Sequence, residues 1–299
     1  MRLKQIQDFI TVIEAGSIHA AARRIGVSQP AITKSVRGLE AELDVQLVRR
    51  TIHGVVPTPA GRALFVRARV AHNELRKAKE EMTQLEGDSS VAFGVGPTAG
   101  MLVVPEAIAD FRRRYPSSRV RILEGLPITL LPLVRDETLD FATGGRPDGK
   151  LDPALQFRPL FRHDFVVVGR KGHPMRNARL LAQLRDADWL SIQPYGLPGG
   201  PLDRMFSSAG LPGPKQTIQC ESYQIIVAVL SKSDMLSIMT SRLLAAPFAR
   251  DSLQQIPVGG SLPSYTAGMF TRKDSPLTRV AAAMAKAVMV AARRLAHAT

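Results

Sequence analysis

Apolar residues recur at helical spacing in the first part of the chain. Residues 3–15 predict an amphipathic helix whose apolar face consists of Leu3, Ile6, Phe9, Ile10 and Ile13. Ser17 predicts the N-cap of a second helix, over residues 17–25, and Ser28 predicts the N-cap of a third. Pro30 fits the first turn of that third helix, where the amide that proline lacks would have no intrahelical partner. Its predicted buried face consists of Ile32, Val36, Leu39 and Leu43.

The polar residues of this third helix form one outward stripe: Gln29, Thr33, Lys34 and Arg37. Hydrogen-bond donors at the leading end of a helix are typical of a helix-turn-helix that reads base edges in a major groove. A helical hairpin with a solvated polar face would show the same pattern. On this stretch alone, both interpretations stay open.

Residues 45–56 are β-branched at both ends and contain His53 and Gly54 in between, which predicts a two-stranded wing. A wing beside a helix-turn-helix commonly lies over the DNA backbone or the minor groove, so Arg49, Arg50, Thr51 and His53 are candidate phosphate or groove contacts. A polar hairpin tip without DNA contacts is an equal alternative.

Thr58 and Pro59 predict the N-cap and first position of a long helix that reaches about residue 86. Its apolar residues alternate spacings of four and three, as in the seam of a coiled coil: Leu64, Ala68, Ala71, Leu75, Ala78, Met82 and Leu85. Such a helix is roughly 40 Å long, too long for the small N-terminal core to cover. We therefore expect it to pair with the same helix of a second subunit.

From residue 91 the pattern changes to alternating strands and helices. Strands at 91–96, 119–124 and 139–143, with helices at 104–115 and 129–135, predict a parallel βαβαβ unit. A second set of predicted strands covers 165–169, 190–192, 217–220, 236–238 and 253–257, with helices at 180–184, 202–209 and 222–231. A strand at 267–271 and a helix at 278–296 remain. If these two return to the first unit, the fold has two α/β lobes and a cleft.

The whole chain resembles the LysR-type transcriptional regulators. The residues that carry the resemblance are Ala21, Ala22, Val27, Ser28, Gln29, Pro30, Ala31, Leu39, Glu40, Leu43, Leu47, Arg50, Thr51, Thr58, Ala60, Gly61, Phe111, Tyr115 and Pro116. Val48 and Pro57 stand where the family usually has Phe and Leu. The resemblance implies an α/β protein with a winged helix-turn-helix at 1–57 and a dimerising linker helix at 58–90. It further implies two lobes resembling a periplasmic-binding-protein fold, with lobe I at 91–161 and 266–299 and lobe II at 162–265.

The same resemblance implies a homodimer or homotetramer that binds double-stranded promoter DNA and acts with RNA polymerase. A small molecule in the cleft would alter transcription. We expect Gln29, Pro30, Thr33 and Lys34 to face bases, and the phosphate contacts to come from Ser28, Arg37, Arg50 and Thr51. The alternative is a solute-binding protein with a fused helical oligomerisation domain, for which a secretory signal would be expected and is not seen.

Composition changes this picture little. The net charge is +14, but residues 1–90 hold 14 Lys/Arg against 10 Asp/Glu, so the greater part of the excess lies beyond the predicted DNA-binding part. Cys220 is the only cysteine, which excludes an internal disulfide and suits a cytoplasmic protein. The apolar runs are too short to span a membrane.

No catalytic constellation is found, so we expect no enzyme activity, no cofactor and no metal. The glycines of residues 94–100 lack dinucleotide-loop spacing, and Pro97 removes an amide that would face phosphate. No serine lies in a G-x-S-x-G motif, and the six histidines have no ligand spacing.

A binding site is expected beyond the carboxyl ends of the predicted strands, where helix N-termini offer free amides. The candidate residues are Pro97, Thr98, Ala99, Gly100, Thr129, Arg146, Gln193, Tyr195 and Ser222. The family resemblance places a hydroxyl residue of the cleft at Thr98. Amides, hydroxyls and Arg146 together favour a small organic anion as effector, although each residue fits a plain cap or turn as well.

Overall fold

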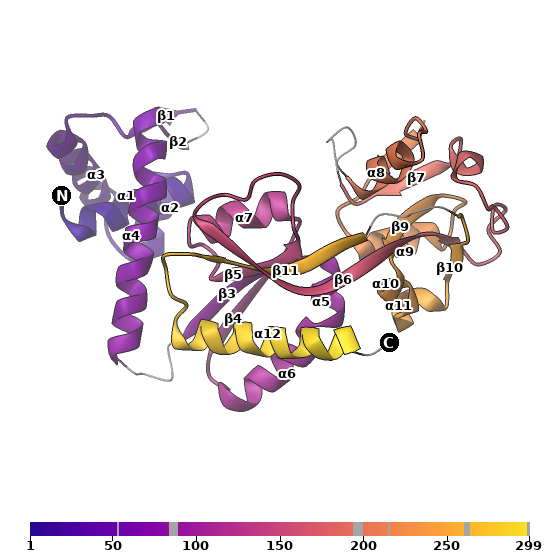
Figure 1. Ribbon diagram of the computed structural model, residues 1–299. Helices are drawn as coiled ribbons and strands as arrows, with labels where there is room; N and C mark the ends of the chain where they lie inside the picture. The colour runs from indigo at the N-terminus through magenta and orange to yellow at the C-terminus, as the bar shows by residue number, and fades with distance from the viewer. Residues whose placement is uncertain (53, 84–88, 194–199, 215, 260–263, 298–299) are drawn as a thin grey trace. The chain divides into compact units, whose positions relative to one another are not determined.

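A computed structural model describes residues 1–299 except 53, 84–88, 194–199, 215, 260–263 and 298–299. The chain divides into two compact units (Figure 1). The first comprises residues 1–89 with 135–138, and the second comprises residues 90–134 with 139–299.

Three helices form the core of the first unit: α1 (Leu3–Ala15), α2 (Ile18–Ile25) and α3 (Gln29–Leu43). The Ser17 hydroxyl accepts a hydrogen bond from the Ala20 amide, and the Ser28 hydroxyl accepts one from the Ala31 amide. Each cap satisfies an amide that has no intrahelical acceptor. Both predicted N-caps are confirmed, and they fix the residues with which α2 and α3 begin.

The buried side chains of this unit come from all three helices and from the segment that follows them: Phe9, Val12, Ala21, Ala22, Ile32, Val36, Leu39, Leu47 and Val55. Two predicted core positions are wrong. Leu3 is 51% exposed and Leu43 is 39% exposed, because each lies in a terminal turn of its helix, beyond the packed middle.

The predicted wing is present as the antiparallel strands β1 (Val48–Thr51) and β2 (Gly54–Pro57). Glu40 of α3 accepts hydrogen bonds from the amides of Leu47 and Val48, at 2.8 and 3.1 Å. Its carboxylate therefore ties the start of the wing to α3. The candidate residue His53 lies outside the described residues.

The long helix α4 (Pro59–Thr83) follows the wing, and Thr58 precedes it as predicted. The Thr58 hydroxyl accepts a hydrogen bond from the Gly61 amide at 3.0 Å and donates one to the Gln46 carbonyl at 2.7 Å. Along the seam Ala68 is buried, whereas Leu75 is 53% exposed and Met82 is 84% exposed. The last seam residue, Leu85, lies outside the described part of the chain.

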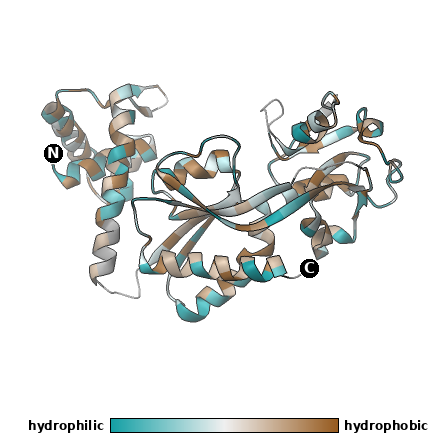
Figure 2. Ribbon diagram, in the orientation of Figure 1, coloured by the Kyte–Doolittle hydropathy of each residue, from teal (hydrophilic) through white to brown (hydrophobic). Residues whose placement is uncertain are grey.

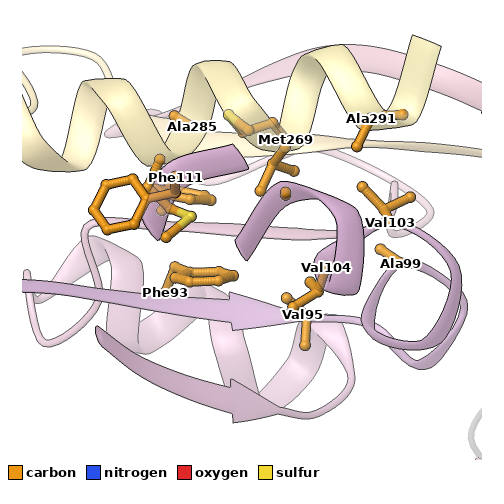
Figure 3. Close-up of a cluster of buried hydrophobic side chains, with 14 of the residues drawn as sticks. Phe93, Val95, Ala99, Val103, Val104, Phe111, Met269, Ala285 and Ala291 are labelled. Atoms are coloured by element: carbon orange, nitrogen blue, oxygen red, sulfur yellow. The ribbon is translucent and has the colours of Figure 1, made fainter. Parts of the chain in front are cut away.

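In the second unit the strands β3 (Ser90–Val95), β4 (Arg119–Glu124) and β5 (Phe141–Gly145) are parallel, as predicted. Helices α6 (Val104–Arg114), α7 (Pro127–Arg135) and α12 (Arg279–His297) accompany them. Figure 3 shows the core between β3, α6 and α12, where Phe93, Phe111 and Met269 lie together. Most residues of α12 are apolar (Figure 2), and its buried side chains belong to this core.

The chain passes between two lobes on the long strand β6 (Leu155–Arg170) and returns on β11 (Ser264–Arg272). These strands pair antiparallel over nine residue pairs, with a register shift at Ala267/Gly268. β11 also pairs with β5, so the last strand does return to the first lobe. The strand predicted at 165–169 covers only the last part of β6. The first half of β6 contains many polar residues, so the sequence showed no apolar run there.

We call β3–β5 with α6, α7 and α12 lobe I, and β7–β10 with α8–α11 lobe II. Lobe II contains β7 (Asp188–Ser191), β8 (Gln216–Gln219), β9 (Leu236–Thr240) and β10 (Leu253–Ile256), with helices α8 (Pro201–Ser208) and α9 (Tyr223–Leu230). A 3-10 turn, η1 (Leu181–Leu184), replaces the predicted helix at 180–184. The sequence did not predict three short helices: α5 (Pro97–Leu102), α10 (Ser241–Ala245) and α11 (Pro247–Arg250). Each has only four to six residues, which is too few to show the helical repeat of apolar residues.

Gly61 lies so close to the backbone of Leu47 that no side chain fits at this position. A Cβ atom at this position would lie 1.9 Å from the Leu47 carbonyl oxygen, and the backbone of both residues is held by Thr58. Gly61→Ala should lower the free energy of unfolding of the first unit by about 1–3 kcal/mol, the usual cost of overpacking. Urea denaturation followed by circular dichroism measures the loss. Gly213→Ala, where a Cβ meets no atom within 4 Å, is the control and should change little; equal stability of the two variants would contradict the prediction.

His163 is a buried histidine whose protonation affects the stability of the second unit. It lies on β6, buried between Phe161 and Tyr265, and neither ring nitrogen has a hydrogen-bond partner. Burial, and to a lesser extent Arg242, lowers the pKa of His163 to about 4, against the opposing effect of Asp164. The folded protein thus holds a neutral imidazole, while the unfolded chain takes up a proton near the ordinary pKa of about 6.5.

The stability due to the neutral imidazole should therefore be complete above pH 6.5 and should decline as the pH falls towards 4, by roughly 3 kcal/mol in total. His163→Phe keeps an aromatic ring and removes the titration. Urea denaturation between pH 4 and 7 should give a flatter profile for this variant than for the wild type. Parallel profiles would show that His163 does not carry this pH dependence.

Candidate functional sites

The N-terminal part of α3 presents its polar side chains on one open depression of the surface. The residues that line it are Gln29, Pro30, Thr33, Lys34, Arg37 and Gly38. Among the described residues, neither Lys34 nor Arg37 has an ion-pair partner. Five of the eight predicted DNA-contacting residues therefore share this surface.

Three hydrogen bonds already involve predicted DNA-contacting residues. Gln29 is hydrogen-bonded to His19 of α2, with 2.6 Å between Nε2 and Nδ1. Ser28 already uses its hydroxyl oxygen to cap α3, and it can still donate the hydroxyl proton to a phosphate. Arg50 and Thr51 lie exposed on β1, and the Thr51 hydroxyl donates to the Gly54 carbonyl across the wing.

The second unit contains a cavity of about 360 Å³ with walls from both lobes. Its lining combines apolar and aromatic groups with a few polar ones: Gly96, Pro97, Thr98, Ala99, Leu126, Pro127, Ile128, Gly144, Gly145, Arg146, Pro147, Asp148, Phe165, Ile192, Gln193, Gly200, Pro201, Arg204, Tyr223, Ile238, Tyr265 and Ala267. An apolar wall with few convergent polar groups is typical of a small-molecule site.

The structure brings five of the predicted effector residues to the cavity: Pro97, Thr98, Ala99, Arg146 and Gln193. It does not place Gly100, Thr129 or Ser222 on the wall. Gly100 lies against Val95, Thr129 is exposed on α7 one residue beyond the lining residue Ile128, and Ser222 caps α9 by accepting from the Ile225 amide. Tyr195 lies outside the described residues.

Sequence reasoning missed the aromatic part of the cavity. Phe165 and Tyr265 stack with ring centroids 5.1 Å apart, and the Tyr265 hydroxyl lies 3.4 Å from the Thr98 hydroxyl. Burial raises the pKa of Tyr265, although the hydrogen bond with Thr98 partly offsets this, and burial also raises the pKa of Tyr223. Both tyrosines are therefore neutral at neutral pH. An aromatic residue in a strand can lie in the hydrophobic core or on the wall of a cavity, and the sequence alone does not distinguish the two positions.

Two arginines line the cavity, and only one was predicted. Arg146 is exposed, with its guanidinium 5.9 Å from the centroid of the Phe157 ring. The missed residue, Arg204, lies on α8 and donates from Nη1 to both carboxylate oxygens of Asp148, at 2.7 and 2.9 Å. This ion pair joins lobe II to the segment that follows β5 of lobe I. On sequence alone, Arg204 was one of many charged residues on a predicted helix.

Two family models match this chain. Residues 3–62 match the bacterial regulatory helix-turn-helix protein model of the lysR family, and residues 86–292 match the LysR substrate binding domain. The chain belongs to the LysR family. It is a helix-turn-helix transcriptional regulator with a substrate-binding domain, as the sequence predicted.

Curated relatives of this LysR-family regulator are similar to it at the level of 27–30% identity. The transcriptional regulator GalR of Pseudomonas putida is 30% identical over 85% of this chain, although the match spans only 65% of GalR. The regulator GbpR of Azospirillum brasilense is 30% identical over 93% of this chain and 83% of its own length.

Solved structures show the same fold. A full-length OxyR variant of Pseudomonas aeruginosa is similar over 96% of this chain and 94% of its own, with a TM-score of 0.71 and 22% identity. Full-length CbnR in complex with its target DNA is similar over 97% of this chain and 100% of its own, with a TM-score of 0.64 and 20% identity.

Membrane-spanning helices and metal-binding clusters are both absent from the described residues of this LysR-family chain. No helix in them is long and apolar enough to cross a membrane. No group of three or more His, Cys, Asp or Glu side chains among them could hold a metal ion.

Proposed function

We propose that this regulator binds promoter DNA as a homodimer or homotetramer, reads bases through the N-terminal part of α3, and responds to a small organic anion in the interlobe cavity. The single observation that carries the proposal is the α3 surface, where donor-bearing side chains of Gln29, Thr33, Lys34 and Arg37 share one face. Such side chains at the start of a helix match base edges and phosphates.

The roles of the individual residues follow from their positions. Gln29, Pro30, Thr33 and Lys34 face bases, whereas Ser28 and Arg37 of α3 and Arg50 and Thr51 of the wing contact phosphates. The hydrogen bonds that Glu40 accepts from the start of the wing keep these two groups in register. The base contacts of α3 and the phosphate contacts of the wing are then held at a fixed spacing by Glu40.

The exposed seam of α4 supports self-association. Leu75 and Met82 are apolar side chains that the single chain leaves in solvent, at the spacing of a coiled coil. Pairing α4 with its copy would bury them and would present two α3 helices to a two-fold operator. At a promoter, RNA polymerase is the partner on which such a dimer would act.

The effector acts on transcription only if it binds one arrangement of the assembly more tightly than another. Support for an anionic effector comes from Arg146 and Arg204 on the cavity wall, and from the hydroxyls of Thr98 and Tyr265. The volume of about 360 Å³ is near the lower end of the range for ligand pockets, so the effector is small.

The base-reading proposal is tested with Thr33→Val and Arg50→Ala. DNase footprinting on the promoter beside the gene first defines an operator, and anisotropy titrations then compare it with scrambled duplexes at several salt concentrations. Thr33→Val should reduce discrimination between operator and scrambled DNA. Arg50→Ala should weaken binding to all duplexes alike and reduce the salt slope by about 1, since one phosphate contact is lost.

Arg293→Ala is the matched control for Arg50→Ala, because it removes the same charge from the exposed surface of α12. It should leave the salt slope unchanged. Full operator discrimination by Thr33→Val, or an unchanged slope for Arg50→Ala, would contradict the residue assignments. Absence of any footprint would contradict the proposed function itself.

The dimer proposal is tested with Leu75→Glu. A charge in the seam of a coiled coil leaves a desolvated carboxylate, so this variant should dissociate at concentrations where the wild type is a dimer or larger. Light scattering after size exclusion measures the mass. Val66→Glu, a partly exposed position on the opposite face of α4, is the control and should keep the wild-type mass. If both variants have the wild-type mass, α4 does not mediate the association.

A further inference from the structure

A hydrogen bond joins His19 of α2 to Gln29 of α3 beside the surface that carries the proposed base contacts. Gln29 Nε2 lies 2.6 Å from His19 Nδ1, and Gln29 lines the open depression on α3. An amide nitrogen can only donate, so Nδ1 accepts and the proton of the neutral ring is on Nε2. The contact therefore fixes the tautomer of His19 and the orientation of the Gln29 amide together.

This hydrogen bond contributes little to the packing of α2 against α3. Both of its side chains are exposed, and water competes for such a contact. The two helices are held together instead by buried side chains, among them Ala21, Ala22, Ile32 and Val36. The effect of the hydrogen bond is therefore on the side chain of Gln29 rather than on the fold.

The backbone of Gln29 is already fixed, so its side chain is the part that a neighbour can orient. Gln29 is the first residue of α3, between the capping residue Ser28 and Pro30. Its side chain still has several rotatable bonds, and the torsion of the terminal amide is broad. Holding the amide in one orientation before DNA binds reduces the cost of ordering it in the complex.

The amide that His19 holds presents one donor and one acceptor to a base. Within the described residues Gln29 makes no other side-chain hydrogen bond, so one N–H and the carbonyl oxygen remain available. In a major groove this pair matches adenine, whose N7 accepts and whose N6 amino group donates.

His19 also disfavours the opposite orientation of the amide. When a base takes one N–H and the groove excludes water, the second N–H of Gln29 needs an acceptor, and His19 Nδ1 supplies it. With the amide turned over, the Gln29 oxygen would face Nδ1, and two acceptors make no hydrogen bond. The neighbour on α2 thus favours one of the two amide orientations.

We propose that His19 is a positioning residue for base recognition, and that it holds the Gln29 amide in the orientation that selects adenine. The inference rests on the proposed function, in which Gln29 faces bases in a major groove. It places a determinant of sequence specificity on α2, outside the helix that contacts the bases.

The test measures operator binding by the full-length protein. Footprinting defines the operator, and a set of duplexes then replaces each base pair of the footprint in turn, with anisotropy titrations giving Kd for each. Gln29→Ala identifies the base pair that Gln29 reads, as the position at which this variant loses discrimination. We expect the wild type to prefer A·T there by about fivefold or more over the other base pairs.

His19→Phe keeps an aromatic ring and removes the acceptor. It should reduce the preference at that one base pair by about threefold or more and leave discrimination at the other positions unchanged. His19→Asn is the conservative variant, because its Oδ1 is attached to Cγ as Nδ1 is in histidine. It should keep the wild-type preference within about twofold, since an acceptor still faces the Gln29 amide.

A double-mutant cycle separates positioning from a merely structural role. In the Gln29→Ala background, His19→Phe should have no further effect on the preference, because the amide that it orients is gone. The urea midpoint of His19→Phe should equal that of the wild type, since the core between the helices is unchanged. Arg23→Gln, exposed one turn further along α2, is the matched control and should leave all base preferences unchanged.

Unchanged preferences in His19→Phe would overturn the inference, as would additive effects in the cycle or a base pair other than A·T at the Gln29 position. Equal weakening of all duplexes by His19→Phe would also overturn it, because that result indicates a structural role. Each of these results leaves base reading by Gln29 standing. If Gln29→Ala discriminated like the wild type, the base-reading assignment would fall and the inference with it, whereas absence of any footprint would contradict the proposed function itself.

Discussion

The antiparallel pairing of β6 with β11 is the constraint on which the effector domain depends. Backbone hydrogen bonds set the register of nine residue pairs. β6 also pairs with β9 and β10 of lobe II, and β11 also pairs with β5 of lobe I. Phe165 of β6 and Tyr265 and Ala267 of β11 lie on the cavity wall, so the pairing that joins the lobes also positions the binding surface. His163, which faces Tyr265 across the pair, stays neutral because its surroundings exclude water.

The chemistry of the cavity results from an apolar wall with charge concentrated at a few points. Phe165, Ile192 and Ile238 favour burial of a carbon skeleton, while Tyr223 and Tyr265 remain neutral because burial disfavours their ionisation. Charge is supplied by the arginines, and a low-dielectric environment strengthens any hydrogen bond that Arg204 makes there. In the proposed function, affinity for the carbon skeleton and selection for the charged group therefore come from different parts of the wall.

In the helix-turn-helix unit, the polar surface of α3 is set by the residue with which α3 begins and by the hydrogen bonds that hold the wing. Ser28 and Pro30 determine the first turn, and so which side chains lead the helix. Glu40 on the same helix accepts hydrogen bonds from two amides at the start of the wing, and Thr58 joins the segment that precedes the wing to the first turn of α4. A small number of hydrogen bonds therefore connects α3, the wing and the helix with the exposed apolar seam.

The features that depend on neighbouring residues could be predicted from the sequence: the caps at Ser17, Ser28 and Thr58, the wing, and the positions of the strands β3–β5. Caps and periodic burial act within a few residues, so they can be read from spacing. The length of β6 and the composition of the cavity, where Thr98 contacts Tyr265 and Arg204 contacts Asp148, depend on the folded chain and could not be predicted from the sequence. These partners lie 167 and 56 positions apart, and no local pattern encodes contacts formed when distant segments pack together.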